Sequence, residues 1–288
     1  MLLKTVGTNV RNALNRSLMS DCILNASLRI AIMTLIMLSG DIERNPGPTQ
    51  SNVQNCLSIL NLNIRSIRNK FDYISTNLLD FDIICFTETH LTTNFTNIEL
   101  EGYSVPFRKD FTAHSNGLLC YTSTQLTSKR LLDLESALVH SIWVEIKYAH
   151  ERLLLCAVYR PPSTADAFWN NFNMCIEKAL DICNKIIIVG DLNEDQLNPS
   201  NNHLKDILLI NDLSNVITQP TRVIDNSSTL IDPIIVTQNF TILDSGVLDV
   251  LHNISDHKAT YISISFTNIS PVLSLERYGS TKGVITTK

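Results

Sequence analysis

Five apolar segments of strand length in this chain carry polar residues at one end, and this arrangement restricts the folds open to it. The residues are Asn63, Glu88, Tyr159 with Arg160, Asp191 with Asn193, and Asp256 with His257. Burying a carboxylate at the end of an apolar strand is costly unless a partner offsets its charge. Oxygen ligands gathered around Mg²⁺ would offset it and leave positions open for phosphate oxygens. One such residue is ordinary at a strand end, whereas five together indicate a shared site.

The remaining pattern predicts an α/β domain. A chain of 288 residues accommodates one large domain of this class with a short extension. Apolar residues at helical spacing predict helices over 70–79, 165–183 and 202–213. Continuous or alternating apolar runs predict strands within 56–67, 81–89, 117–123, 140–148, 152–162, 185–193, 228–237 and 254–266.

Charge and cysteine content exclude few functions. The net charge is −5, which does not favour nucleic acid, but a carboxylate-rich metal site is itself acidic. The seven cysteines form no C-x-x-C pair and no Cys/His spacing suited to zinc. Several lie in apolar runs, so we expect small buried side chains in a reducing compartment.

Six short motifs occur in a fixed order along the chain: "LNLNIRSI", "CFTETHL", "VYRPPS", "IIVGDLN", "STLIDPI" and "ISDHKAT". Their order resembles that of the endonuclease/exonuclease/phosphatase superfamily. "YRPP" together with "SDH" is most similar to the endonuclease domain of non-LTR (LINE-type) retrotransposons. The resemblance covers residues 57–266. It implies a two-sheet α/β sandwich with helices on the outer faces and a site between the sheets at the strand ends.

The resemblance also implies a metal-dependent nuclease. Asn63, Glu88 and Asp256 match the metal site, with Glu88 binding Mg²⁺ directly and Mn²⁺ as the alternative ion. Asp191 matches the carboxylate that orients or deprotonates the attacking water. The product would be a DNA nick with a 3′-hydroxyl, which in such elements primes reverse transcription.

Four further residues match groups that surround the phosphate in this family. Tyr159 matches a phenol that contacts the scissile phosphate, and Asn193 matches an amide that holds it. Asp232 matches the carboxylate that orients His257, and His257 matches the group that stabilises charge on the phosphorane. These roles would place a cation and a proton acceptor where charge develops during hydrolysis.

Three residues are candidates for contacts with DNA. Thr221 and Arg222 lie in "TQPTRVIDNSS", which resembles the segment that reaches toward the target groove. Arg160 could contact the DNA backbone, and a structural ion pair is an equally good interpretation of this side chain.

The stretch "DIERNPGP" at residues 41–48 resembles a 2A-type ribosome-skipping peptide. The positions that match are Asp41, Glu43, Asn45, Pro46, Gly47 and Pro48. The resemblance implies that the bond between Gly47 and Pro48 fails to form during translation. The alternative is an Asn-Pro-Gly-Pro turn between a leader and a domain.

These interpretations divide the chain into a leader (1–47), a linker (48–56), a catalytic domain (57–266) and a linker or truncated tail (267–288). The expected partners are target DNA, element RNA and a reverse transcriptase encoded elsewhere, and we expect no stable membrane association of the main domain. The expected site of action is the nucleus, although the leader could act as a secretory signal if skipping fails. The alternatives are a phosphatase of the same superfamily, an inactive retroelement fragment, or a protein in which the leader is the functional part.

Overall fold

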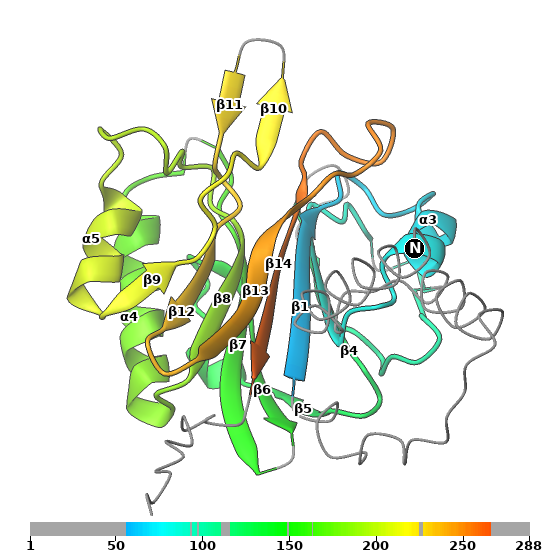
Figure 1. Cartoon of the computed structure of the whole chain (residues 1–288), viewed down its shortest axis with the longest axis horizontal. Coiled ribbons are helices and arrows are strands. Elements are labelled where there is room, and N and C mark those ends of the chain that lie inside the picture. The colour runs from blue at the N-terminus through cyan, green and yellow to red at the C-terminus, as the bar shows by residue number, and fades with distance from the viewer. Residues whose placement is uncertain are drawn as a thin grey trace, which may run out of the picture.

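The computed structural model describes residues 56–265 except 93, 97, 111–115, 149, 163 and 225–226. The leader, the motif at 41–48 and the tail from residue 267 lie outside the described residues. In the described part, two six-stranded sheets pack against each other, and a two-stranded hairpin projects from one end (Figure 1). None of the described helices is long and apolar enough to cross a membrane.

The first sheet is built around a parallel pair of strands, β1 (Cys56–Asn63) and β2 (Ile83–Thr87), which are connected through the short helix α3 (Phe71–Asn77). Both strands are buried on both faces, as parallel strands usually are. Antiparallel strands flank the pair. These are β13 (Thr241–Leu248) and β14 (Ala259–Ser265) beside β1, and β4 (Leu118–Thr122) and β3 (Phe107–Lys109) beside β2.

The second sheet repeats this plan with the parallel pair β7 (Glu151–Tyr159) and β8 (Ile186–Asp191), which are joined through α4 (Ala167–Ile182). The strands β6 (His140–Tyr148) and β5 (Thr127–Arg130) lie beside β7, and the short helix η1 (Leu132–Leu134) joins them. The strands β12 (Ile234–Thr237) and β9 (Leu213–Asn215) lie beside β8, and α5 (His203–Ile210) precedes β9. The hairpin consists of β10 (Arg222–Ile224) and β11 (Ser227–Thr229).

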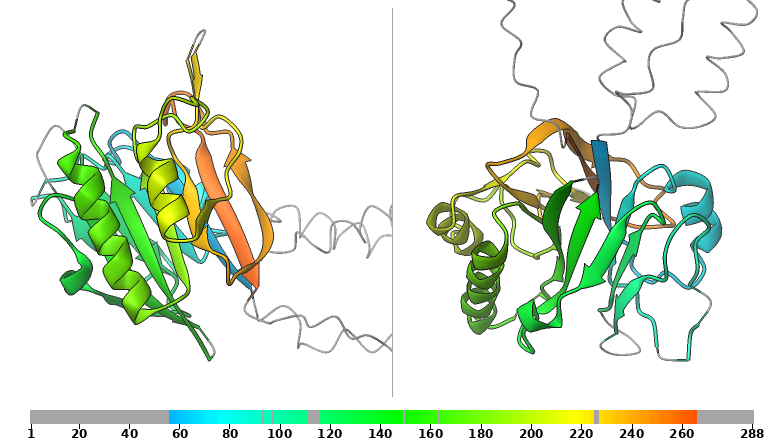
Figure 2. Two further views of the ribbon diagram at one scale, coloured as in Figure 1. Left: turned by 90° about the vertical axis from the view of Figure 1, so that its left-hand side faces the viewer. Right: turned by 90° about the horizontal axis from the view of Figure 1, so that it is seen from below.

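Three buried apolar layers hold these elements together. One lies between the sheets, and another lies between the second sheet and the helices α4 and α5, which cover its outer face (Figure 2). The third covers the outer face of the first sheet with α3 and with loop residues such as Leu91 and Leu100. The predicted two-sheet sandwich is therefore confirmed. The first sheet, however, carries only one short helix among the described residues, and loops supply the rest of its cover.

One predicted strand is divided in the structure, and five strands were not predicted, namely β3, β5, β9, β10 and β13. Segment 228–237 forms β11 and β12 with Asp232 in the connection between them, because the Thr221 hydroxyl accepts the backbone N–H groups of Ile231 and Asp232 (3.1 and 3.2 Å). Strand β13 was not predicted at all. Its side chains are half-exposed or exposed and its pairing with β14 contains a bulge, so its sequence lacks a regular apolar period.

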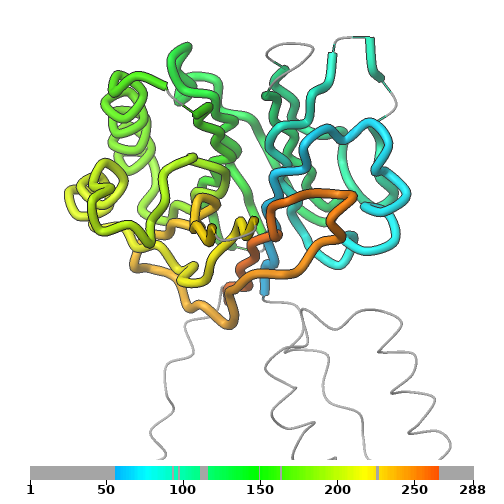
Figure 3. The backbone as a smooth tube through the Cα atoms, turned by 90° about the horizontal axis from the view of Figure 1, so that it is seen from above, coloured from blue at the N-terminus to red at the C-terminus, as the bar shows by residue number. Residues whose placement is uncertain are grey.

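The topology brings the carboxyl ends of both parallel pairs to the end from which the hairpin projects (Figure 1). Seen from that end, the loop before β14 runs beside the loop after β1 (Figure 3), and the Ser255 hydroxyl donates to the carbonyl of Asn63 at 2.6 Å. In β8, Gly190 has φ +151°, and a Cβ there would lie 1.8 Å from the carbonyl oxygen of Val158. Only glycine allows this close approach, which fixes the register directly before Asp191.

Candidate functional site

A buried Asp–His pair lies where the two sheets meet. The Nδ1 of His257 is 2.9 and 3.1 Å from the two carboxylate oxygens of Asp232, and the side chains are only 5% and 1% exposed. The Thr221 hydroxyl donates to the same carboxylate at 2.6 Å. The backbone N–H of His257 donates to the Ser255 hydroxyl at 3.0 Å. Hydrogen bonds to the imidazole and to the backbone N–H of His257 therefore fix the position of the ring.

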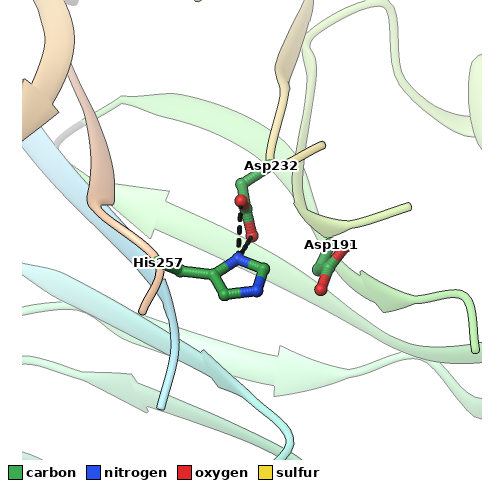
Figure 4. Close-up of side chains that lie close together, drawn as sticks. All are labelled: Asp191, Asp232 and His257. Atoms are coloured by element: carbon green, nitrogen blue, oxygen red, sulfur yellow. Dashed lines mark hydrogen bonds and ion pairs between the residues drawn. The ribbon is translucent and has the colours of Figure 1, made fainter. Parts of the chain in front are cut away.

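Asp191 completes a cluster with this pair. Ligand-type atoms of Asp191, Asp232 and His257 all lie within 4.8 Å of one another, and the Asp191 carboxylate lies beside the imidazole, near its second ring nitrogen (Figure 4). Asp191 accepts hydrogen bonds from Nδ2 of Asn63 at 2.8 Å and from the backbone N–H of Asn193 at 2.9 Å. The structure thus brings the predicted water-activating carboxylate to the predicted histidine.

The cluster has unusual protonation properties. Burial raises the pKa of the Asp191 carboxyl, and the charge of Asp232 raises it further. Burial alone would lower the pKa of His257, but the Asp232 carboxylate outweighs burial and raises that pKa to about 9. His257 is therefore an imidazolium at neutral pH. Asp191 is a stronger base than an ordinary aspartate, as a group that takes a proton from water should be.

A second group of polar residues lies against this cluster. Oε1 of Glu88 accepts hydrogen bonds from Nδ2 of Asn63 at 2.9 Å and from the Tyr159 hydroxyl at 3.0 Å. Burial, together with the charges of Glu88 and Asp191, raises the pKa of Tyr159 well above its ordinary value, so the phenol keeps its proton. Asn63 donates to both Glu88 and Asp191 and thereby connects the two groups.

Two of these residues have a strained backbone. Glu88 has φ +51° and Asn193 has φ +46°, in the left-handed region that non-glycine residues rarely occupy. Such conformations cost about 1–3 kcal/mol each and persist where the surroundings impose them, often at functional sites. Both follow the last residue of a central parallel strand within two positions, so the turn out of the sheet directs them toward the site.

The oxygen donors at Glu88 fit a hard divalent cation better than the Asp191–Asp232–His257 cluster does. Metal ligands must be deprotonated, and His257 carries a proton at neutral pH. At Glu88, Oε1 is engaged by Asn63 and Tyr159, whereas Oε2 has only a long contact of 3.7 Å with His90 Nε2 within the described part of the chain. A carboxylate oxygen with room for a ligand is what Mg²⁺ requires.

Asp256, a predicted metal ligand, is engaged elsewhere in the structure. Its Oδ1 is 2.7 Å from Nη1 of Arg65, and its Oδ2 is 2.9 Å from Nε and 2.8 Å from Nη2 of Arg222. Burial tends to raise the pKa of Asp256, but the two guanidinium groups outweigh it and lower the pKa to about 2. The structure therefore joins Asn63 and Glu88 but places Asp256 in an ion-pair cluster. The sequence does not predict this ion pair, because Arg65 and Asp256 are 191 residues apart.

The three candidates for DNA contacts have different surroundings. Thr221 is fully buried and supports Asp232, a role that sequence reasoning missed because an isolated loop threonine carries no signal for it. The Arg160 guanidinium donates to loop carbonyls, including that of Leu192 at 3.2 Å, and lies over the Trp169 ring at 5.0 Å. These surroundings indicate a structural role, but within the described residues Arg160 bonds to carbonyl groups and packs on an aromatic ring instead of forming the expected ion pair. Arg222 remains accessible on β10, with 38% of its side chain exposed.

Asn193 contributes to the site mainly through its backbone. Its N–H donates to Asp191, while its side-chain amide donates to the carbonyl oxygen of Arg160 at 2.8 Å. Two residues that were not predicted also support the site. Ser255 ties the loop before β14 to Asn63, and Arg65 donates its backbone N–H to Oδ1 of Asn63 at 3.2 Å.

The comparison with protein families gives one match. The sequence pattern described as the Endonuclease/Exonuclease/phosphatase family matches residues 50–257. Among curated proteins, none matches the chain by sequence.

Solved structures share the fold at low sequence identity. The endonuclease domain of TRAS1, a telomere-specific non-LTR retrotransposon, has a TM-score of 0.58 at 16% identity, over 72% of this chain and 98% of that domain. The 3′-5′ exonuclease NExo from Neisseria meningitidis has a TM-score of 0.58 at 12% identity, over 73% and 100%. TDP2 from D. rerio, complexed with a single-strand DNA product, has a TM-score of 0.54 at 13% identity, over 73% and 99%.

Proposed function

Because the chain belongs to the endonuclease/exonuclease/phosphatase family, we propose that it is a metal-dependent phosphodiesterase that nicks DNA. Members of this family are hydrolytic nucleases and phosphodiesterases. The observation that carries the proposal is the buried pair of Asp232 and His257 with the Asp191 carboxylate beside the imidazole (Figure 4). A fixed cation beside a carboxylate of raised pKa suits hydrolysis of a phosphodiester.

In this proposal, water attacks the phosphorus of the scissile phosphodiester. Asp191 orients the water and accepts its proton, and Asn63 and the Asn193 N–H hold Asp191 in place for this role. The imidazolium of His257 lies beside the phosphoryl oxygens and stabilises the negative charge that grows on them. The bond from phosphorus to the 3′ oxygen breaks, and the leaving oxygen takes up a proton from solvent water to become the 3′-hydroxyl. The oxygen of the attacking water remains on phosphorus as part of the 5′-phosphate of the other fragment.

Glu88 and Asn63 would hold the divalent cation. When bound, Mg²⁺ supplies Lewis-acid stabilisation of charge on the phosphate oxygens, and Mn²⁺ can replace it. The hydrogen bonds of Asn63 and Tyr159 to Oε1 fix the Glu88 carboxylate and direct Oε2 away from them. Tyr159 keeps its single proton, so it donates a hydrogen bond to the phosphate only in exchange for its bond to Glu88, and Asn63 then holds Oε1.

Nicking of a supercoiled plasmid by the full chain tests this function. We expect Mg²⁺-dependent conversion to the open circle, and loss of it in EDTA and in Glu88→Gln, which keeps the side-chain shape but removes the charge. Glu101→Gln changes an exposed glutamate and should nick as the wild type does. Cleavage that survives EDTA would contradict the metal site. Release of inorganic phosphate from a phosphomonoester, without nicking, would favour a phosphatase.

The retrotransposon resemblance extends the proposal. The 3′-hydroxyl at the nick would prime reverse transcription of element RNA in the nucleus by a reverse transcriptase encoded elsewhere. The likeness in fold to the TRAS1 endonuclease domain supports this role. Ribosome skipping at residues 47–48 would free the catalytic domain from the leader, so that residues 48–288 form a separate product.

A further inference from the structure

One carboxylate directly before His257 binds two arginines from distant parts of the chain. We call Arg65, Asp256 and Arg222 the guanidinium bracket. Oδ1 of Asp256 accepts from Arg65 at 2.7 Å, and Oδ2 accepts from Arg222 at 2.8 and 2.9 Å. Each oxygen of the Asp256 carboxylate therefore accepts hydrogen bonds from one guanidinium group. The three side chains together carry a net charge of +1, in a protein whose net charge is −5.

Both arginines keep donors free for a ligand. Within the described part of the chain, the Arg65 side chain bonds to Asp256 through Nη1, and Arg222 bonds through Nε and Nη2. A guanidinium carries five N–H donors in a planar fork. Side-chain exposure is 53% for Arg65 and 38% for Arg222, against 18% for Asp256. In the bracket, the carboxylate is therefore less exposed than the two guanidinium groups, and the N–H groups that do not bond to it remain available to a ligand from solvent.

The bracket is attached to the catalytic residues on both sides. Arg65 donates its backbone N–H to Oδ1 of Asn63. Arg222 forms an isolated antiparallel bridge with His257, and Asp256 directly precedes that histidine. The backbone carbonyl of Thr221 also accepts the N–H of Lys258 at 2.7 Å. These connections place the two cations next to the position that the reacting phosphate occupies in the proposed reaction.

We propose that Arg65 and Arg222 bind a DNA backbone phosphate adjacent to the one that is hydrolysed, and that Asp256 is the residue that positions both guanidinium groups. The inference rests on the proposed nuclease function. Arginine forks match phosphate geometry and bind it through paired hydrogen bonds. A shared carboxylate holds the two long side chains in place before DNA arrives, which reduces the entropy lost on binding.

This assignment differs from a metal-ligand role for Asp256. A cation at its oxygens would have to displace a guanidinium group, and it would then lie beside two positive charges. Asp256→Asn should therefore leave the Mg²⁺ concentration for half-maximal nicking unchanged, while it raises KM for DNA. Glu88→Gln should instead abolish the Mg²⁺-dependent activity.

Salt dependence of DNA binding tests the bracket without catalysis. The full chain is titrated against a fluorescent duplex in EDTA at salt concentrations between about 50 and 200 mM. Losing one phosphate contact lowers the slope of log Kd against log salt by about 0.9. Because both arginines bind the same phosphate, Arg65→Gln and Arg222→Gln should each lower the slope, and the double variant should lower it by about 0.9 in total. Arg65→Lys and Arg222→Lys keep the charge and should keep the slope.

Arg152→Gln is the matched control. Arg152 is also exposed and paired with a carboxylate, Glu145, at 2.5 Å, but it lies at the start of β7, seven residues and roughly 23 Å from Tyr159. The slope of log Kd against log salt for Arg152→Gln should equal that of the wild type. Two results would contradict the phosphate contact but not the nuclease function, provided that the wild type nicks DNA. One is a wild-type salt slope in both glutamine variants, and the other is a slope in the Lys variants that is lowered as much as in the glutamine variants. If the wild type neither nicks nor binds DNA, the proposed function itself is wrong.

Discussion

Replacing Asp232 with asparagine removes the charge beside His257 and keeps the size of the side chain. In the wild type, Nδ1 of His257 lies 2.9 and 3.1 Å from the two Asp232 oxygens, and both side chains are almost fully buried. Burial lowers the pKa of the imidazole and the carboxylate raises it. Without the carboxylate, the largest contribution that raises the pKa is lost while burial still lowers it, so the pKa should fall well below 9 and a smaller share of the rings should be charged at neutral pH.

The expected loss follows from the size of that effect. A pKa of about 9 instead of 6.5 corresponds to roughly 3 kcal/mol in favour of the charged ring. If that charge stabilises the transition state, its loss should lower the nicking rate by on the order of 100-fold, because each 1.36 kcal/mol is tenfold in rate. His257→Ala should lower the rate by at least ~100-fold, the low end for losing such a group.

The assay is the pH dependence of kcat/KM for plasmid nicking. A cationic His257 is present below its pKa, so wild-type activity should fall as pH rises through about 9. In Asp232→Asn this alkaline limb should move to lower pH. Asp181→Asn changes an exposed aspartate and should leave the limb in place. Adding His257→Ala to Asp232→Asn should cost little beyond His257→Ala alone, because the two act as one unit. An unmoved alkaline limb, or multiplicative losses in the double variant, would refute this reasoning.

Two further predictions concern the fold and translation. Gly190→Ala would place a Cβ 1.8 Å from the Val158 carbonyl oxygen at φ +151°, so we expect roughly 2–5 kcal/mol lower stability in urea unfolding. Gly102→Ala also has positive φ, but no atom lies within 4 Å of the added Cβ, so it should cost only about 1 kcal/mol, and equal losses would contradict the steric explanation. In cell-free translation, a reporter fused after residue 60 should appear largely free of the leader, and Pro48→Ala should restore one full-length product. A single full-length band from the unchanged sequence would exclude skipping.

Much of the fold and the centre of the site could be predicted because they depend on local pattern. Apolar runs identified the central strands β1, β2, β7 and β8, which are buried on both faces. Parallel strands end at the same edge, so the residues at their ends had to meet. The structure indeed joins Asn63, Glu88, Tyr159 and Asp191 by direct hydrogen bonds.

The remaining features depend on contacts between distant segments. Asp256 ends in an ion-pair cluster because Arg65 and Arg222 reach it from the β1 loop and from β10, and no local pattern encodes that meeting. Thr221 supports Asp232 from eleven residues away, where a sequence shows only one more loop threonine. Strand β13 lacks an apolar period because its side chains stay partly exposed.

The chemistry of the plasmid nick tests the central claim most directly. Open circles produced by the full chain with Mg²⁺ are purified and given to a DNA polymerase with labelled nucleotides, which extends only a 3′-hydroxyl. The proposed hydrolysis predicts immediate incorporation of label at the nick, and none in DNA treated with Glu88→Gln. Two results would contradict a nuclease that leaves a 3′-hydroxyl. One is open circles that accept label only after treatment with a 3′-phosphatase, and the other is plasmid that stays supercoiled with folded wild-type protein and Mg²⁺.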